Sequence, residues 1–418
     1  MCTTYLASEL ITEFAEYDVI GYPRLVRLNP NIPWKTRGNG AIAVRLGKGN
    51  GKRFLIGNIE EKDYFGYLRG RSVAIPNVKK RIERIMEEHA QFSDKNTNPA
   101  FVVMEKKPTP GLYWKAVREV VNLKDVKNIL KMGNASYKGY KNQRGLIGAT
   151  SAISWHPRDR TYEVIVYREK NRWGTKRRVD THSVIEMDRK FPSTFNNYDM
   201  HNKVVAITPN SPCPVLFGIR GDKPRDLLKA KDSIKSEKKD RWILFETNQG
   251  TDEHLHKKTL GKISKYSSVV TSGMVGSKPR TIEGGHVIFK IKNRGTMDCA
   301  AYEPTKEFRT LIRSLEPGDL ITVYGGVREY PLTINIEKIQ IKKLIDVYEK
   351  VGNPVCKKCK KRMKSIGRGA GYRCIKCGAK VKEEDVKLEK VKRDMKKGFY
   401  EVPVCARRHL SKPLKRYS

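Results

Sequence analysis

The sequence predicts a multidomain α+β protein with a zinc ribbon near its C-terminal end. The chain has 418 residues, which is enough for three or four domains of ordinary size. Apolar residues follow helical spacing in the first part of the chain and strand spacing further on, which is typical of a chain that mixes both element types. Two neighbouring C-x2-C pairs add a metal-binding unit.

The composition indicates a polyanionic partner. Lys and Arg number 85 against 45 Asp and Glu, so the formal net charge is +40, and nucleic acid is the first partner to expect. Adaptation to a hot habitat is the alternative, although it adds charges of both signs. No stretch approaches the roughly 18 apolar residues of a membrane span, and the first residues lack a signal-peptide pattern. We therefore expect a soluble, cytoplasmic protein.

The first 260 residues predict two mixed domains. Helical spacing recurs three times before residue 132, which predicts one unit over residues 1–132 and a second over residues 133–260. The apolar sets at helical spacing are Leu6, Leu10 and Phe14; Val78, Ile82, Ile85 and Met86; and Val117, Val120 and Val121. The strands predicted for the second unit are "TYEVIVYRE" and "KVVAIT".

Residues 264–346 predict a small barrel. Apolar residues alternate along five short strands, and "EPTKEFRTLIRSLEPGD" between the third and fourth strands predicts one amphipathic helix. The apolar face of this helix consists of Phe308, Leu311, Ile312 and Leu315. Five strands with a helix after the third is the order of an OB-fold, which binds oligonucleotides. An unrelated small barrel is the alternative.

Residues 350–384 predict a zinc ribbon. Two C-x2-C pairs separated by fourteen residues can close a tetrahedral site of four thiolates, which suits a structural zinc ion with no open coordination position. The predicted ligands are Cys356, Cys359, Cys374 and Cys377. A redox dithiol is the alternative.

Basic side chains surround the first knuckle and recur, between aromatic residues, in a C-terminal tail over residues 385–418. Cations pair with phosphates and rings stack on bases, so both segments are candidates for RNA binding. The candidate contact residues are Lys357, Lys358 and Arg362 in the ribbon and Arg407 and Arg408 in the tail.

Two segments of the first unit are candidates for phosphate chemistry. Thr3 stands at the predicted start of a helix, where phosphate binds readily and a hydroxyl can accept a phosphoryl group. A plain helix cap is the alternative. The segment from Trp34 to Gly40 combines Lys35 and Arg37 with Gly38, Asn39 and Gly40, and glycines allow the backbone to approach a phosphate closely. A tight basic turn is the alternative, because the segment is not a Walker A sequence.

Asp188 and Asp199 are carboxylates in an otherwise basic chain. They are candidates for holding a cationic small molecule, and partnership with nearby lysines is the alternative.

Several segments, taken in chain order, resemble one enzyme family. They are "MCTTYLA", "GYPRLVRLNPNIPWKTRGNGA", "TNPA", "RGLIGA", "NSPCPVLFGIRG", "IEGGHV", "YEPTKEFR", the zinc ribbon and "GFYEVPVCARRHLSKPL". In this order they are similar to the archaeal tRNA(Ile) 2-agmatinylcytidine synthetases. The resemblance implies a kinase-like α/β ATP-binding domain, a ferredoxin-like domain, an OB-fold and a zinc ribbon, in that order.

The resemblance also implies a reaction. Such an enzyme attaches agmatine to C2 of the wobble cytidine in the CAU anticodon of an isoleucine tRNA. The C2 oxygen is a poor leaving group, so ATP phosphorylates it, and the amine of agmatine then displaces phosphate. The base has to leave the anticodon stack to be reached.

By the same resemblance, Thr3 corresponds to a threonine that is itself phosphorylated. Lys35, Arg37 and the turn formed by residues 38–40 correspond to a segment expected to contact the triphosphate. Asp188 and Asp199 become candidates for agmatine, whose two cationic ends both favour carboxylates. The OB-fold and the ribbon are expected to hold the tRNA.

The N-terminus departs from the family pattern. Family members begin with a strand and a Gly-Ile-Asp-Asp-Thr-Asp-like segment whose carboxylates bind magnesium, and this chain starts inside the motif that follows. We therefore expect the Mg²⁺ ligands to lie upstream of Met1 and the first unit to lack an early strand. The alternatives are a non-catalytic RNA-binding protein that uses the OB-fold and the ribbon, or a binder of single-stranded DNA.

Overall fold

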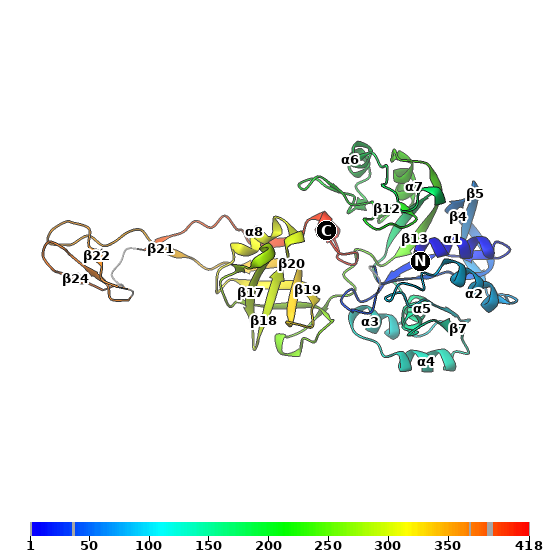
Figure 1. Cartoon of the computed structure of the whole chain (residues 1–418), viewed down its shortest axis with the longest axis horizontal. Helices are drawn as coiled ribbons and strands as arrows, with labels where there is room; N and C mark the ends of the chain where they lie inside the picture. Colours follow the sequence, from blue (N-terminus) through cyan, green and yellow to red (C-terminus); the bar gives the residue numbers. More distant parts are fainter. Residues whose placement is uncertain (1, 36–37, 368, 383–387, 418) are drawn as a thin grey trace.

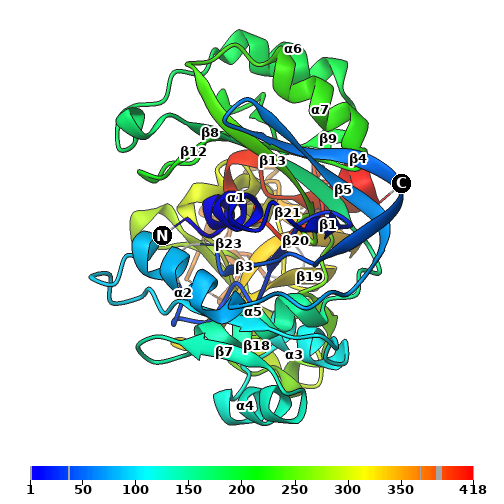
Figure 2. The ribbon, with the colours of Figure 1, turned by 90° about the vertical axis from the view of Figure 1, so that its right-hand side faces the viewer.

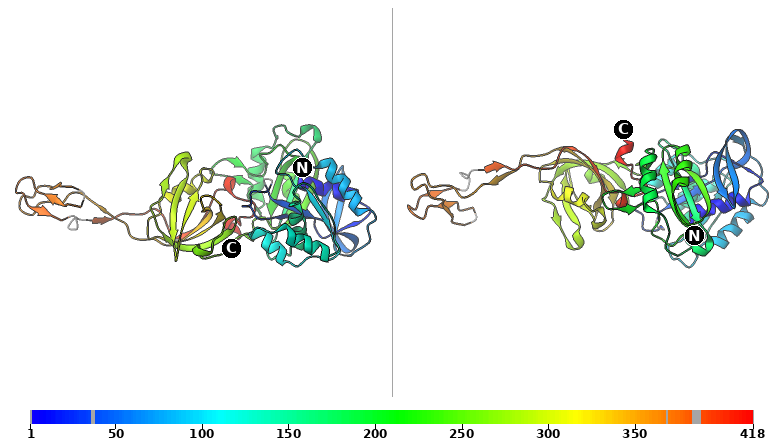
Figure 3. Two further views of the ribbon diagram at one scale, coloured as in Figure 1. Left: turned by 60° about the horizontal axis from the view of Figure 1, so that its bottom comes forward. Right: turned by 90° about the horizontal axis from the view of Figure 1, so that it is seen from above.

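The computed structural model of the protein describes residues 2–35, 38–367, 369–382 and 388–417. The molecule is elongated, with an α+β body, a barrel and a small ribbon in a row (Figure 1). Two further views show the same order (Figure 3). The multidomain α+β prediction is therefore confirmed.

One nine-stranded sheet runs through the α+β body. Seven strands follow the order β1-β5-β4-β13-β8-β12-β9, while β2 pairs with β13 and β3 pairs with β2. The strands are β1 (Asp18–Ile20), β2 (Arg24–Arg27), β3 (Gly40–Ala43), β4 (Leu46–Ile59), β5 (Lys62–Arg71), β8 (Thr161–Arg168), β9 (Thr194–Phe195), β12 (Val215–Gly221) and β13 (Lys239–Thr247).

This sheet crosses the boundary predicted at residue 132. β13 pairs antiparallel with β4 and parallel with β2, although β13 lies in the second predicted unit and its two partners lie in the first. In β8, Val164 and Val166 face one core, and Ile165 and Tyr167 face another. A strand buried on both faces appears in a sequence as a continuous apolar run, which explains "TYEVIVYRE".

Helices cover both faces of the sheet (Figure 2). α6 and α7 pack on one face, α1 lies on the other, and α2 to α5 lie beyond α1 with a separate pair of strands, β6 and β7. The bounds are α1 (Thr3–Glu13), α2 (Val78–His89), α3 (Gly111–Arg118), α4 (Leu123–Met132), α5 (Gly145–Ser154), α6 (Thr181–Lys190), α7 (Pro224–Ser233), β6 (Ala100–Val103) and β7 (Ser136–Gly139). Side chains cap two of these helices: Asn122 accepts the Lys124 N–H at the start of α4, and Asp180 accepts the Ser183 N–H at the start of α6.

Two predicted elements of the body were wrong in extent. α3 ends at Arg118 because Glu119 adopts an extended backbone, so Val120 and Val121 are not helical. The segment "KVVAIT" contributes only β11 (Val204–Val205), because its partner β10 (Tyr198–Asp199) offers just two residues to pair with.

The predicted five-stranded barrel is confirmed. β15 pairs with β17 and β19, β18 pairs with β17 and β20, and β19 pairs with β20, which closes the barrel. The strands are β15 (Ser268–Val275), β17 (Val287–Lys292), β18 (Thr296–Ala301), β19 (Leu320–Val327) and β20 (Thr333–Lys343). Two short strands extend the sheet, β14 (His256–Lys257) beside β15 and β16 (Arg280–Thr281) beside β17.

The helix predicted after the third barrel strand is divided. A single 3₁₀ turn over Glu303–Thr305 precedes α8 (Phe308–Arg313), because Lys306 between them has a φ of +49°. The predicted apolar face is confirmed, since Phe308, Ile312 and Leu315 are buried in the barrel core.

The ribbon follows the barrel on two extended segments that pair as β21 (Tyr348–Lys350) and β25 (Leu388–Lys390). Its own sheet has three short strands, β22 (Lys364–Ser365), β23 (Tyr372–Arg373) and β24 (Lys380–Val381). The core of this unit consists of Met363, Tyr372 and the cysteines, so it is very small.

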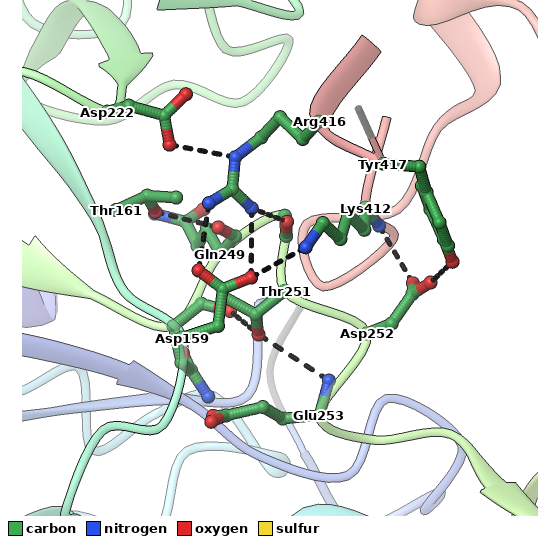
Figure 4. A network of polar contacts seen from close by, with 12 residues as sticks. Asp159, Thr161, Asp222, Gln249, Thr251, Asp252, Glu253, Lys412, Arg416 and Tyr417 are labelled. Atoms are coloured by element: carbon green, nitrogen blue, oxygen red, sulfur yellow. Dashed lines mark hydrogen bonds and ion pairs between the residues drawn. The ribbon is translucent and has the colours of Figure 1, made fainter. Parts of the chain in front are cut away.

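The chain then returns to the junction between barrel and body. β26 (Gly398–Glu401) pairs with β20, and residues 404–417, which we call the C-terminal strap, continue between the two bodies. Arg416 contacts Asp159 at 2.9 Å and Asp222 at 2.8 Å, and Lys412 contacts Asp159 at 3.0 Å (Figure 4). The helices of the described residues are all too short or too polar to reach across a bilayer.

A buried carboxylate at this junction predicts acid sensitivity. Burial by itself raises the pKa of Glu337, but the neighbouring His254, Arg408 and Lys338 outweigh burial and lower the pKa from 4.5 to about 2. A lowered pKa stabilises the folded state above the unfolded pKa, and this contribution is lost as the pH falls from about 4.5 towards 2. We expect the Glu337→Gln variant to lose less stability than the wild type over this interval, measured by urea unfolding at each pH. Equal losses would contradict the prediction.

Candidate functional site

A cavity of about 1280 Å³ lies between α1, α2 and α5. Most of its wall is apolar, with Leu6 and Leu10 from α1, Ile82 from α2 and Ile147 from α5. The volume is sufficient for a nucleotide-sized ligand.

The strands β3 and β6 both line this cavity. Within the described residues, β3 pairs only with β2 and β6 pairs only with β7, so each leaves one edge unpaired. Both strands also pack against α5. Two free strand edges along one cavity, above a shared helix, form the surroundings of an inner strand.

Three residues of the basic loop reach the same cavity. Lys35, Asn39 and Gly40 line it, and the Gly38 carbonyl accepts a hydrogen bond from Arg27 Nη1 at 3.4 Å. Burial, and secondarily the charge of Arg408, lower the pKa of Lys35. Arg37 lies outside the described residues.

Thr3 lies at the start of α1 and lines the cavity as well. Cys2 is the N-cap residue but its side chain does not cap the helix, so N–H groups of the first turn remain available. The structure thus brings Thr3 and the basic loop together, although more than thirty residues separate them in the chain.

Asp188 and Asp199 lie elsewhere. Neither lines the cavity, and each already has internal partners. Asp188 accepts from the Asn197 amide at 2.7 Å, while Asp199 is buried and accepts from the Asn202 and Cys405 N–H groups at 2.9 and 3.0 Å. Their binding role stays a prediction.

The sequence analysis missed a second charged group at the cavity. Glu246 lines it and accepts from Arg24 and Arg160, both at 3.1 Å. The available signal was Arg24 and Glu246 within apolar strand segments, because a charge in a buried strand requires a partner.

The four cysteine sulfurs of the ribbon lie within 4.8 Å of one another. The two knuckles also share one backbone geometry: Lys360 N–H donates to Cys356 O, and Gly378 N–H donates to Cys374 O. Four converging thiols with no other donor type fit a structural zinc ion, as predicted.

The two predicted RNA-contact segments differ in exposure. Lys357, Lys358 and Arg362 are exposed on the ribbon. By contrast, Arg407 pairs with Glu401 at 2.7 Å and its side chain is 7% exposed, while Arg408 contacts Asn31 and Glu337. The RNA role of these two arginines stays a prediction, and their present contacts hold the strap in place.

Three family models match the chain. The TiaS TCKD domain matches residues 1–142, the TiaS FLD domain matches residues 143–254, and the TiaS C-terminal zinc ribbon domain matches residues 353–395.

Similar proteins agree with these models over almost the whole chain. The tRNA(Ile) 2-agmatinylcytidine synthetase TiaS of Methanocaldococcus jannaschii is 44% identical, with 99% of this chain and 95% of the relative covered. The synthetase of the same name from Archaeoglobus fulgidus is 43% identical, with 99% and 94% covered.

Solved structures agree as well. The crystal structure of a complex of TiaS with its isoleucine tRNA and ATP is 40% identical with a TM-score of 0.85, and that of a complex of TiaS with the same tRNA, AMPCPP and agmatine is 37% identical with a TM-score of 0.81; each comparison covers 100% of this chain and 94% of the other. The chain belongs to the tRNA(Ile) 2-agmatinylcytidine synthetase (TiaS) family.

Proposed function

We propose that the protein uses ATP to attach agmatine to an isoleucine tRNA, tRNA(Ile). Family membership over nearly the whole chain carries this proposal, because related proteins have been crystallised with this tRNA, with ATP or AMPCPP and with agmatine. The cavity that gathers Thr3, Lys35, Asn39 and Gly40 is the proposed nucleotide site. A tRNA substrate also implies a cytoplasmic location.

The proposed target is C2 of the wobble cytidine in the CAU anticodon. A phosphoryl group passes from ATP to the C2 oxygen, and the primary amine of agmatine then attacks C2. The bond between C2 and the phosphorylated oxygen breaks, phosphate leaves with that oxygen, and the amine loses a proton.

Individual roles follow from charge and position. Lys35 neutralises the triphosphate, and Gly38, Asn39 and Gly40 allow the backbone to approach it. Thr3 is the proposed phosphoacceptor of the protein itself. The barrel and the exposed ribbon cations hold the tRNA, and Asp188 and Asp199 remain proposed agmatine contacts.

We also propose that the two halves of the body have the kinase-like and ferredoxin-like folds that the resemblance implies. The proposed units span residues 1–132 and 133–260.

Phosphoryl transfer normally requires magnesium, but the described residues around the cavity do not form a site for it. The carboxylates that line the cavity are Glu105, Glu119 and Glu246, and Glu246 is already paired with two arginines. We therefore derive no step through the metal. We propose instead that an extended acidic segment between β3 and β6 supplies the ligands, which the two free strand edges support.

Incorporation of radiolabelled agmatine into tRNA(Ile) with a CAU anticodon tests these proposals. The 418-residue chain is compared with the same chain extended upstream by its in-frame codons. We expect ATP-dependent incorporation by the extended chain, at least tenfold slower incorporation by the shorter one, and none into tRNA with uridine at the wobble position. No incorporation by either chain would overturn the proposed function, and equal rates would overturn the magnesium proposal alone.

A further inference from the structure

The basic loop at the cavity is held by the barrel. The chain leaves β2 at Arg27, passes along the barrel and returns as β3 at Gly40. Within this loop, Trp34 lies against Tyr266, which directly precedes the first barrel strand, with ring centroids 6.0 Å apart. One segment therefore contacts both the barrel and the proposed nucleotide site.

Asn29 fixes the base of the loop. Its side chain is almost fully buried, and Nδ2 donates to Glu119 O at 3.1 Å and to Tyr266 O at 2.8 Å. Its Oδ1 accepts from Asn31 N–H at 2.9 Å, and its carbonyl oxygen accepts from Asn39 Nδ2 at 2.8 Å. Asn29 thus connects the body, the barrel and both arms of the loop.

Asn31 provides the second connection to the barrel. Its Nδ2 donates to Ser267 O at 2.9 Å and to Ser268 Oγ at 2.8 Å, and its Oδ1 accepts from Arg408 Nη1 of the strap at 2.8 Å. The approach to the barrel is so close that a Cβ added at Gly326 would lie 2.2 Å from Asn31 Oδ1. Glycine at position 326 of β19 is therefore required for this contact.

The other arm of the loop carries the residues that line the cavity. Asn39 has a φ of +36°, and its carbonyl oxygen accepts from Leu28 N–H at 2.9 Å. Because Asn39 is also bonded to Asn29, a shift at Asn29 or Asn31 displaces the arm that bears Asn39 and Gly40. The backbone at these positions has to stay in place if it is to approach a phosphate.

We propose that Asn29 and Asn31 are positioning residues through which the barrel sets the conformation of the nucleotide-binding loop. The barrel then has two roles, since it contributes to tRNA binding and also shapes the ATP site. This inference rests on the proposed function, which assigns the loop to ATP.

Equilibrium dialysis with radiolabelled ATP tests the inference, using the chain that incorporates agmatine. We expect Asn31→Ala to raise the Kd for ATP about tenfold and to leave the KM for agmatine within twofold. Gly326→Ala, which changes a barrel residue far from the cavity in sequence, is expected to have the same effect. Because a Cβ at residue 326 collides mainly with Asn31, the double variant Asn31→Ala/Gly326→Ala is expected to be no weaker than either single variant.

Two matched substitutions in the barrel serve as controls. Asn293→Ala removes an amide that bonds to a barrel carbonyl at 2.9 Å, and Gly261→Ala adds a methyl group whose nearest neighbour is 3.9 Å away. Neither residue contacts the loop through a described hydrogen bond, so both variants should bind ATP as the wild type does.

Lys35→Ala separates the inference from the function on which it rests. If Lys35→Ala weakens ATP binding while Asn31→Ala and Gly326→Ala do not, the positioning role is overturned and the loop assignment stands. If none of the three weakens ATP binding, both are overturned. Equal weakening by the two control variants would also overturn the inference, because the effect would then reflect general damage to the barrel.

Discussion

Replacement of Cys374 by serine is expected to abolish zinc binding and to unfold the ribbon while the rest of the molecule stays folded. Structural zinc contributes about 10 to 16 kcal/mol of apparent binding free energy in small zinc units, and that free energy is the folding free energy of the unit. The ribbon core is too small to replace it, since it consists of Met363, Tyr372 and the cysteines. The change should remain local, because within the described residues the ribbon joins the barrel through β21 and β25.

Three measurements check this expectation. Metal analysis should fall from one zinc per chain to none, while the main thermal transition should shift by no more than a few degrees. The affinity for tRNA(Ile) should fall, and its dependence on salt should become weaker, because exposed cations of the ribbon no longer meet phosphates in a fixed arrangement. Cys213→Ser is the control, since Cys213 lies outside the ribbon and a serine can keep its contact with Arg177. Retention of zinc by Cys374→Ser would contradict the four-ligand site.

Asp252→Asn is expected to destabilise the junction between barrel and body by about 3 to 5 kcal/mol, the usual cost of breaking a buried ion pair. The ammonium group of Lys338 is fully buried and contacts both carboxylate oxygens of Asp252, at 2.7 and 2.6 Å. The strap completes this site, because the Lys412 carbonyl accepts from the same ammonium group and the Tyr417 hydroxyl donates to Asp252 (Figure 4). Asparagine preserves the shape but leaves a buried charge without a counter-ion.

Urea unfolding of a variant set tests this expectation. The double variant Asp252→Asn/Lys338→Met should recover most of the loss, because removing both charges also removes the unpaired ion. Asp346→Asn breaks the exposed pair with Lys390 at 2.7 Å and should cost less than about 1 kcal/mol. If Asp252→Asn and Asp346→Asn had equally small effects, the buried pair would not stabilise the junction.

Local patterns carried the successful predictions. The alternation of Val287, Phe289 and Ile291 identified a barrel strand, and the spacing of the cysteines identified the zinc site, because in both cases the relevant neighbours follow from a short stretch of chain. The helix at Thr3 was equally local.

Features that depend on distant partners were not predictable in this way. The pairing of β4 with β13 joins strands about 190 residues apart, and no local period specifies it. Arg407 illustrates the same limit for single residues: its composition suggested an RNA contact, whereas Glu401 and Asn196 hold it inside the protein. Asn29 escaped notice because a buried amide has no periodic signature.

The place of Leu410 gives the order of synthesis a structural meaning. This side chain is buried in the core that α3, α4 and α5 form, yet it is made more than 250 residues after α5 ends. At roughly 5 to 20 residues per second, the ribosome reaches it roughly 10 to 50 s later. During that interval the first-made unit exposes an unfinished core to chaperones and proteases, and a chain released before Leu410 never closes it. The fold therefore distinguishes completed chains from interrupted ones.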